Sequence, residues 1–235
     1  MLDSLQKMDA MHLMRLHISC LFTRNEEGAL QKINEPWGAV KDAPLLYLGK
    51  TINGEYCFAF HESISSEQRK EICMLSEEMA KEEVFLERCQ RLLGAKQQET
   101  DLAYLLPKQP ELQETAVLLT RKTLEAQEER KTFAWLTDEI DVVQPCIGIM
   151  QKEEIASLCR SVRVTKEAHE AGLETLPAYR GQGLAVIAAA AWANEVYQKN
   201  ALPLYSTSLE NLPSQRVVQK LEGILYGRGY SFYAK

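Results

Sequence analysis

The residues from 170 to 185 combine side chains that do chemistry with a backbone suited to holding a ligand. An alternating run ends at Pro177, a basic glycine-containing loop follows over 179–183, and an alanine-rich run begins at Leu184. Small residues let the main chain approach a ligand closely. The first N–H groups of a helix lack internal partners, and the helix dipole adds partial positive charge there. The segment therefore predicts a phosphate-binding loop, to which Arg180 adds a full charge.

The glycine spacing excludes two common phosphate loops. It matches neither G-x-x-x-x-G-K-[ST] nor G-x-G-x-x-G. The pattern is Arg-x-x-Gly-x-Ala, at Arg180, Gly183 and Ala185, inside the longer Thr-x-Pro-x-Tyr-Arg-Gly-x-Gly-Leu-Ala. It resembles the coenzyme A pyrophosphate loop of the GNAT superfamily of N-acetyltransferases. The alternative is a glycine turn between strand and helix that binds nothing.

The resemblance implies acetyl-coenzyme A as cosubstrate, with no metal. The loop would hold the pyrophosphate mainly through N–H groups of the run Arg180, Gly181, Gln182, Gly183, Leu184 and Ala185. The main chain of Leu173, Thr175 and Leu176 would bind the pantetheine arm, and an N–H there would stabilise the oxyanion of the tetrahedral intermediate. Asn211 and Ser214 echo the family's Asn-x-x-Ser/Ala, where the asparagine contacts coenzyme A. Asn211 is equally well placed as an ordinary helix N-cap for the Ser214 N–H.

Two glutamates are candidates for the general base. Side chains alternate along a strand, so Glu170, Gly172 and Glu174 share one face. An attacking amine with a pKa of ~10.4 is protonated at pH 7, and removing its proton costs roughly 4 to 5 kcal/mol. A carboxylate that takes this proton removes that cost. The resemblance implies Glu170 as the base, with Glu174 as second candidate; the alternative is that both are solvent-facing strand residues.

The general acid departs from the family pattern. Many relatives have a tyrosine four residues after the Ser/Ala position, where this chain has Val218. The family's closing Gly-Phe is also absent, because Glu222-Gly223 stands there. Tyr226 or Tyr230 would then protonate the leaving thiolate, or the thiolate leaves without an acid.

The remaining polar residues have weaker functional signals, and some of them are expected to be structural. His169 would face the opposite side of the strand from Glu170, and Tyr205 is read as a core strand residue. Arg160 and Arg163 are candidates for steering phosphate, although exposed strand arginines are common. The four histidines have no metal-ligand spacing.

Composition limits the function classes. The chain has 235 residues, 46% of them hydrophobic, so it can bury a core. A net charge of −6 and the lack of a basic block argue against nucleic-acid binding. A mild acidic excess suits a cationic amine substrate and ordinary solubility equally.

The cysteines and the N-terminus predict a cytoplasmic protein. None of the six cysteines forms C-x-x-C, so they are expected to be buried free thiols in a reducing compartment. Lys7, Asp9, Arg15 and His17 interrupt the apolar residues that a signal peptide requires. No run approaches the ~20 apolar residues of a membrane span.

The first 95 residues predict a helical and hairpin domain. A helix is expected over residues 1–20, with its inner face formed by Leu5, Met8, Leu13, Leu16 and Cys20. A loop over 25–44 and a hairpin over 45–60, turning at Asn53-Gly54, follow. Ser65 and Gln68 form a capping box for a helix that reaches Gly94, with one break. The polar stretch 95–100 is the predicted linker.

The remaining residues predict an α/β domain. The expected elements are a strand at 102–106, a helix at 110–136, strands at 142–150, 154–164 and 168–175, a helix at 184–199, a strand at 202–207, a helix at 211–221 and terminal strands at 224–233. This order resembles a GNAT domain, and the resemblance covers residues 98–235. It implies a mixed, mostly antiparallel sheet flanked by helices in residues 96–235, preceded by a smaller α+β domain in residues 1–95. The motif is similar to the zwittermicin-resistance-like branch.

The predicted activity is acetyl transfer from acetyl-coenzyme A to an amine by direct attack in a ternary complex. The acceptor would be a small molecule or a peptide amine bound between the two domains. No nucleic acid or membrane partner is expected, and a homodimer is left open. The alternatives are a non-catalytic coenzyme A-binding or protein-interaction module, and a structural domain whose glycine loop is empty.

Overall fold

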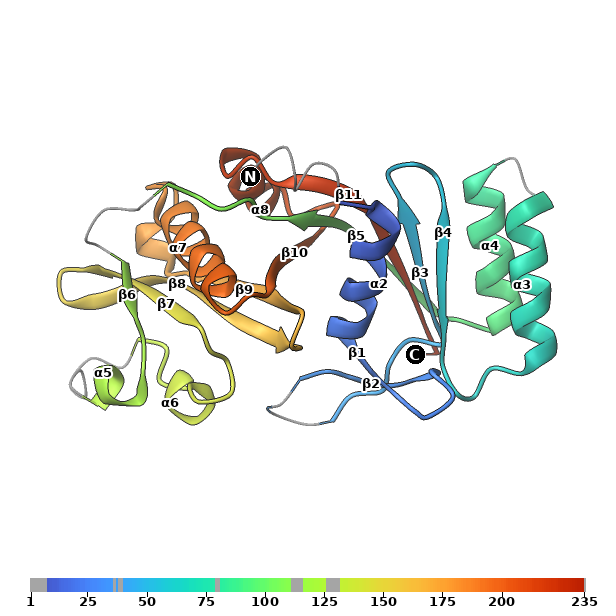
Figure 1. Cartoon of the computed structure of the whole chain (residues 1–235), viewed down its shortest axis with the longest axis horizontal. Coiled ribbons are helices and arrows are strands. Elements are labelled where there is room, and N and C mark those ends of the chain that lie inside the picture. Colours follow the sequence, from blue (N-terminus) through green and yellow to red (C-terminus); the bar gives the residue numbers. More distant parts are fainter. Residues whose placement is uncertain are drawn as a thin grey trace.

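A nine-stranded sheet forms the centre of the computed structural model, which describes residues 8–35, 37, 40–78, 81–110, 116–125 and 132–234 (Figure 1). Its strand order is β4-β3-β11-β5-β10-β9-β8-β7-β6. The strands are β3 (Leu46–Thr51), β4 (Tyr56–Phe60), β5 (Gln97–Leu105), β6 (Ala116–Leu118), β7 (Cys146–Gln151), β8 (Glu154–Val164), β9 (Ala168–Thr175), β10 (Leu202–Ser208) and β11 (Ile224–Tyr233).

All neighbouring strands in this sheet run antiparallel except β9 and β10, which are parallel. The structure therefore confirms the predicted mixed, mostly antiparallel sheet flanked by helices. A separate two-stranded sheet pairs β1 (Phe22–Arg24) with β2 (Leu30–Ile33), and β2 lies within the loop predicted over 25–44.

Helices cover both faces of the large sheet. The helix α7 (Leu184–Gln198) packs on β7, β8, β9 and β10, and α2 (Ala10–Leu21) packs on β3, β9 and β11. Figure 1 shows α3 (Ser66–Glu78) and α4 (Glu82–Leu93) side by side at the β4 end. The shorter helices are α5 (Arg121–Glu125), α6 (Leu136–Glu139) and α8 (Leu212–Lys220).

The inner face of α7 follows its apolar spacing, since Ala188, Ala189, Trp192 and Val196 are buried, while Ala185 is half-buried. Small alanines let the helix axis lie close to the sheet, while one tryptophan fills the space between them.

The inner face of α2 differs from the prediction. Leu13 and Cys20 are buried, but Leu16 is only half-buried and the buried stripe includes His17. Leu5 lies outside the described residues. A histidine is tolerated there because polar groups from two strands meet it, as described below. Asp9 caps the helix by accepting from the N–H groups of Met11 and His12.

The proposed boundary between the two domains is crossed by the sheet itself. The hairpin β3–β4 forms as predicted and joins the sheet through the pairing of β3 with β11. The predicted linker is wrong in part, because residues from Gln97 onward form β5, which pairs with β11 along its whole length. The division into residues 1–95 and 96–235 stays a prediction.

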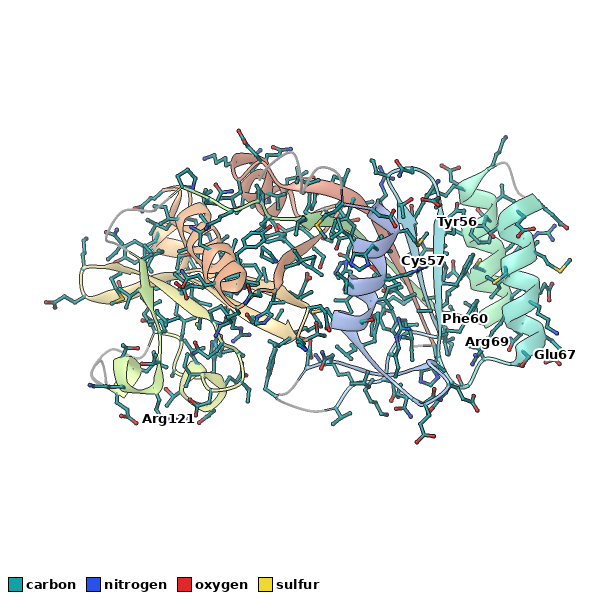
Figure 2. All side chains as sticks on the ribbon, viewed as in Figure 1. Tyr56, Cys57, Phe60, Glu67, Arg69 and Arg121 are labelled. Atoms are coloured by element: carbon teal, nitrogen blue, oxygen red, sulfur yellow. The ribbon has the colours of Figure 1, made fainter. Side chains whose placement is uncertain are left out.

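The capping box and the helix break in the first 95 residues are confirmed. Ser65 and Gln68 exchange backbone-to-side-chain hydrogen bonds of 3.2 Å at the start of α3. Gly94 ends α4 at a φ of +61°, a conformation that favours glycine. The guanidinium of Arg69 on α3 lies 5.9 Å from the ring centre of Phe60 on β4, which ties the helix to the sheet (Figure 2).

Two predicted elements are wrong. The helix expected over 110–136 is replaced by β6, α5 and α6 in the described residues; 111–115 and 126–131 lie outside them. The terminal strands expected over 224–233 form one strand, β11, whose register with β5 shifts between Leu225 and Gly227. Such a bulge leaves Tyr226 without a partner on β5 and redirects its side chain.

All six cysteines are free thiols, four of them buried, while Cys57 and Cys73 are half-buried. None of the helices in the described ranges is long and apolar enough to span a bilayer.

Candidate active site

The strands β9 and β10 separate after three paired residues. The parallel register runs from Ala168 with Leu202 to Glu170 with Leu204 and ends there, although both strands continue. Backbone groups alternate between the two edges of a strand. The N–H of Leu202 donates to Glu167 O, so the backbone groups of 171, 173 and 175 also point toward β10. The sheet thus opens beside the C-terminal half of β9.

The glycine loop follows at the end of this opening. A short 3₁₀ turn, Pro177–Tyr179, leads into Gly181 and Gly183, whose φ angles are +78° and +81°. No described atom lies within 4 Å of a Cβ built on either glycine, so the space above the loop is open. Gly183 is the N-cap of α7, and no described side chain caps this helix. The helix amides remain available to an anion.

The opening, the loop and α8 enclose one cavity of about 780 Å³. The lining contains most of the predicted cofactor residues, namely Leu173, Thr175, Leu176, Arg180, Gly181, Gly183, Leu184, Ala185, Asn211 and Ser214. Gln182 does not line it; its side-chain amide donates to Ala178 O at 3.4 Å. Among the lining residues in the described part of the chain, Glu174 is the only acidic one, whereas Arg180, Arg216 and Lys220 are basic.

Four further residues line the cavity although the sequence did not predict them there, namely Phe133, Tyr205, Arg216 and Lys220. The two basic residues stand four apart on α8, so helical spacing after Asn211 and Ser214 offered a signal for them. Phe133 gave no signal, because only the tertiary fold brings its turn to the cavity.

Three predicted residues have their polar groups partly used within the protein, and the first is Thr175, whose carbonyl accepts from Arg180 Nε at 3.3 Å. The N–H of Leu176 donates to Ala156 O and its carbonyl accepts from Tyr179 N, both at 2.9 Å, so its side chain alone faces the cavity. The side-chain oxygen of Asn211 accepts from Ser214 N at 3.1 Å, which confirms the N-cap. The amide nitrogen of Asn211 is not needed for that bond.

Tyr205 projects from β10 into the cavity wall. Its hydroxyl lies 2.8 Å from Ser214 Oγ, and the side chain is buried. Burial raises the pKa of Tyr205 to about 12, and the hydrogen bond with Ser214 only partly opposes this. The phenol therefore keeps its proton at neutral pH. Val218, at the family's usual tyrosine position, is buried in the core between α7 and the sheet.

Glu170 and Tyr226 lie outside this cavity, under α2. Glu170 Oε1 accepts from the backbone N and the Oγ of Ser206, at 2.8 and 2.6 Å. His17 Nε2 lies 3.3 Å from Glu170 Oε2, and His17 Nδ1 lies 2.8 Å from the hydroxyl of Tyr226. Glu170 and Tyr226 are each 1% exposed. Neither reaches the cavity directly.

The charge on Glu170 is set by two opposing effects. Burial raises its pKa, but the electrostatic attraction of the nearby His17, together with the hydrogen bonds from Ser206, outweighs burial, so the pKa lies below its ordinary value. Tyr226 shows no such compensation, since burial and the nearby Glu170 charge both raise its pKa well above the ordinary value.

Glu174 lies at the far end of the same face of β9. It lines the cavity, its side chain is 47% exposed, and its Oε1 is 3.9 Å from Arg160 Nη2. Arg160 is committed elsewhere, because it pairs with Glu139 at 3.0 Å and stacks 4.0 Å from the ring centre of Trp135. Arg163, the other predicted phosphate-steering residue, pairs at 2.7 Å with Glu35. Neither arginine lines the cavity.

His169 has the predicted structural place on the opposite face from Glu170. Its Nδ1 lies 2.9 Å from Ser161 Oγ, which also accepts from the indole N–H of Trp192 at 3.1 Å. Burial, helped by the charge of Lys199, lowers the pKa of His169 to about 4. Tyr230 is also remote from the cavity, because its hydroxyl donates to Glu82. In the described ranges, no three His, Cys, Asp or Glu side chains gather as metal ligands would.

A comparison with models of known protein families finds a match. Residues 145–233 match the family model described as GNAT acetyltransferase. The matched segment is less than half of the chain, and it contains β9, the glycine loop and α8. The match agrees with the predicted family over this segment, whereas nothing in the comparisons bears on the zwittermicin-resistance-like branch. A comparison with curated protein sequences finds no match.

Three solved structures show similar folds at low identity. A GNAT-family acetyltransferase from Novosphingobium aromaticivorans has 15% identity and a TM-score of 0.49 over 59% of this chain and 65% of that one, less than two thirds of its length. A GCN5-related N-acetyltransferase-like protein from Streptococcus suis has 18% identity and a TM-score of 0.44, covering 63% and 67%. A GNAT-family acetyltransferase from Colwellia psychrerythraea has 13% identity and a TM-score of 0.47, covering 79% and 81%.

Proposed function

We propose that this protein transfers an acetyl group from acetyl-coenzyme A to an amine, by direct attack in a ternary complex. The observation that carries the proposal is the single cavity in which the opened β9 edge, the uncapped α7 terminus and basic side chains meet. An extended thioester with a diphosphate at one end requires these three features together.

The residues fit coenzyme A from one end to the other. The amides of residues 181–185 suit the pyrophosphate, with Arg180 beside them. The basic side chains of Arg216 and Lys220 on α8 suit further phosphate charge. The main chain of Leu173 and the N–H of Thr175 suit the amides of the pantetheine arm, because unpaired groups at a strand edge bind extended chains, whereas the Thr175 carbonyl already accepts from Arg180 Nε at 3.3 Å. The cofactor supplies the activated acetyl group.

Two residues of the cavity wall suit the proton transfers. Glu174 is the carboxylate that an amine in the cavity can reach, so we propose it as the base, directly or through water. Tyr205 keeps its proton at neutral pH and lines the same cavity, so it can donate to the departing thiolate. Glu170, which the sequence favoured as the base, points from β9 toward α2 and does not line the cavity, and we assign it a different role below.

The first test of the proposal is binding followed by turnover. We expect calorimetry to show one site for coenzyme A, and acetyl-coenzyme A to raise the melting temperature, because a ligand of the native state stabilises it. Release of free thiol is then followed against a panel of small and peptide amines, with alcohols as acceptor controls. Absence of binding contradicts the whole proposal.

A non-catalytic coenzyme A-binding module is the second candidate. The buried Val218 at the usual tyrosine position favours it, because that acid is missing. Tight binding without thiol release for any amine supports this alternative. We keep the zwittermicin-resistance-like branch as a proposal that rests on the loop motif alone.

A further inference from the structure

The separation of β9 and β10 has a specific local cause. The N–H of Leu202 donates to Glu167 O, and alternate residues of a strand point the same way, so the N–H of Ser206 also faces β9. In a continued ladder it would donate to the carbonyl of Ala171. Instead it donates to the side chain of Glu170, at 2.8 Å. The carboxylate takes the place of a backbone carbonyl and leaves the edge of β9 unpaired.

A carboxylate in this position needs partners, because an isolated buried charge is very costly. Glu170 Oε2 makes no hydrogen bond of good geometry in the described residues, and its nearest partner is His17 Nε2 at 3.3 Å. The side chains of this pair are 2% and 1% exposed. The ring of His17 is fixed from behind by the hydroxyl of Tyr226, which the bulge in β11 directs toward it.

We propose that His17 is a positioning residue for coenzyme A binding, because it holds the Glu170 carboxylate against Ser206 and so keeps β9 and β10 apart. This inference rests on the proposed function. It also gives α2, far from the glycine loop in sequence, a part in forming the cavity.

Other charged or titratable groups act on the same carboxylate. Arg163 on β8 favours its charged form, and Asp101 on β5, Cys20 on α2 and Tyr47 on β3 lie close enough to interact with its charge. With His17 removed, burial is no longer offset and Glu170 takes up a proton more readily. A protonated carboxyl accepts more weakly than a carboxylate or an amide, and its O–H needs an acceptor of its own, so the Ser206 N–H can pair with Ala171 instead, which narrows the opening. Coenzyme A binding should weaken, and more at low pH than at high pH.

The test is the dissociation constant for coenzyme A from pH 6 to pH 8, measured by calorimetry on the full chain. His17→Met removes the donor, and His12→Met is the matched control at an exposed position of the same helix. We expect binding by His17→Met to be about tenfold weaker than wild type at pH 6 and closer to wild type at pH 8. His12→Met should bind like wild type.

A double variant separates this role from a simple packing defect. In His17→Met/Glu170→Gln, the neutral amide oxygen still accepts from Ser206 and needs no charged neighbour. We expect the double variant to bind better than His17→Met and to lose the pH dependence; failure of this rescue overturns the inference. If His17→Met weakened binding only through a packing defect at position 17, the double variant would bind as weakly as the single variant.

The outcomes distinguish this inference from the proposed function. If wild type does not bind coenzyme A, both fail; if wild type and His17→Met bind equally at every pH, only this inference fails. Should His17→Met not fold, Glu170→Leu is compared with Glu170→Gln, since only the amide can accept from Ser206. Wild-type affinity in Glu170→Leu then overturns the inference.

Discussion

The two sides of strand β9 have the same kinds of polar residue in opposite environments. Toward α8 lies an open cavity with a tyrosine, a serine and basic side chains, lined also by Glu174 at the strand end. Under α2 lie a tyrosine, a histidine and a glutamate that are buried, with a half-buried serine beside them. In the cavity, polar atoms remain available to a ligand, whereas under α2 they are used to hold four elements together.

The comparison teaches that residue type alone does not distinguish a reacting group from one that shapes the site. Glu170 and Tyr226 have the chemistry of a base and an acid, yet neither lines the cavity. Glu174 and Tyr205 have the same chemistry and do line it. Contact with the cavity therefore separates the two pairs, and the following predictions test that separation.

The largest effect is expected from closing the cavity at its loop. Gly183→Asp places a carboxylate at the start of α7, where it accepts the free amides and repels phosphate. Two like charges at 4 Å cost about 4 kcal/mol near a protein surface, so coenzyme A affinity should fall at least about a hundredfold. Calorimetry measures this. Gly54→Asp is the matched control, since Gly54 has a similar φ of +88° in the β3–β4 turn with no atom near its Cβ.

The two tyrosines should respond differently to loss of the hydroxyl. Tyr205→Phe removes the cavity acid and should lower kcat by about a hundredfold, with KM for acetyl-coenzyme A within about threefold. Tyr226→Phe leaves His17 Nδ1 without its buried partner and should cost about 1 to 3 kcal/mol of unfolding free energy, with a smaller fall in kcat. Steady-state kinetics and urea unfolding measure both. A larger kcat loss in Tyr226→Phe would reverse the assignment of the two sides.

The smallest effect concerns His169 on the face opposite Glu170. Its folded-state pKa of about 4 lies below the ordinary 6.5, so the unfolded chain takes up the proton first. Stability should therefore fall as pH drops from about 6.5 to about 4, and His169→Gln should flatten that slope. Urea midpoints across this range measure it, with His12→Gln as the exposed control. Equal slopes in wild type and His169→Gln would contradict the buried neutral histidine.

Much of the fold around the glycine loop was predictable from local patterns. The bounds of β9, α7, β10 and α8 agree with the predicted elements to within a residue or two. Alternation, alanine spacing, glycines and the Asn211 cap are all local signals, and they act within a few residues. The helix over 110–136 was wrong because β6 is specified by pairing with β7, a contact that no local composition shows.

The site residues that act through their backbone were predictable from the sequence, whereas those whose role depends on burial by other elements were not. The loop residues follow from chain geometry and the Leu173–Thr175 edge from the family resemblance, and all of them except Gln182 line the cavity. The place of Tyr205 was missed because strand alternation does not reveal which face of a sheet a cavity occupies. Likewise, His17 gave no signal on α2, since its partners come from β9 and β11.

The amino-acid sequence by itself determined the glycine loop, the strand before it and the helix after it, because turn geometry and side-chain periodicity are properties of neighbouring residues. Only the tertiary structure decided which glutamate and which tyrosine face the cavity. Solvent access and hydrogen-bond partners depend on what packs above each residue, and here that is α2, a segment about 150 residues away in the chain.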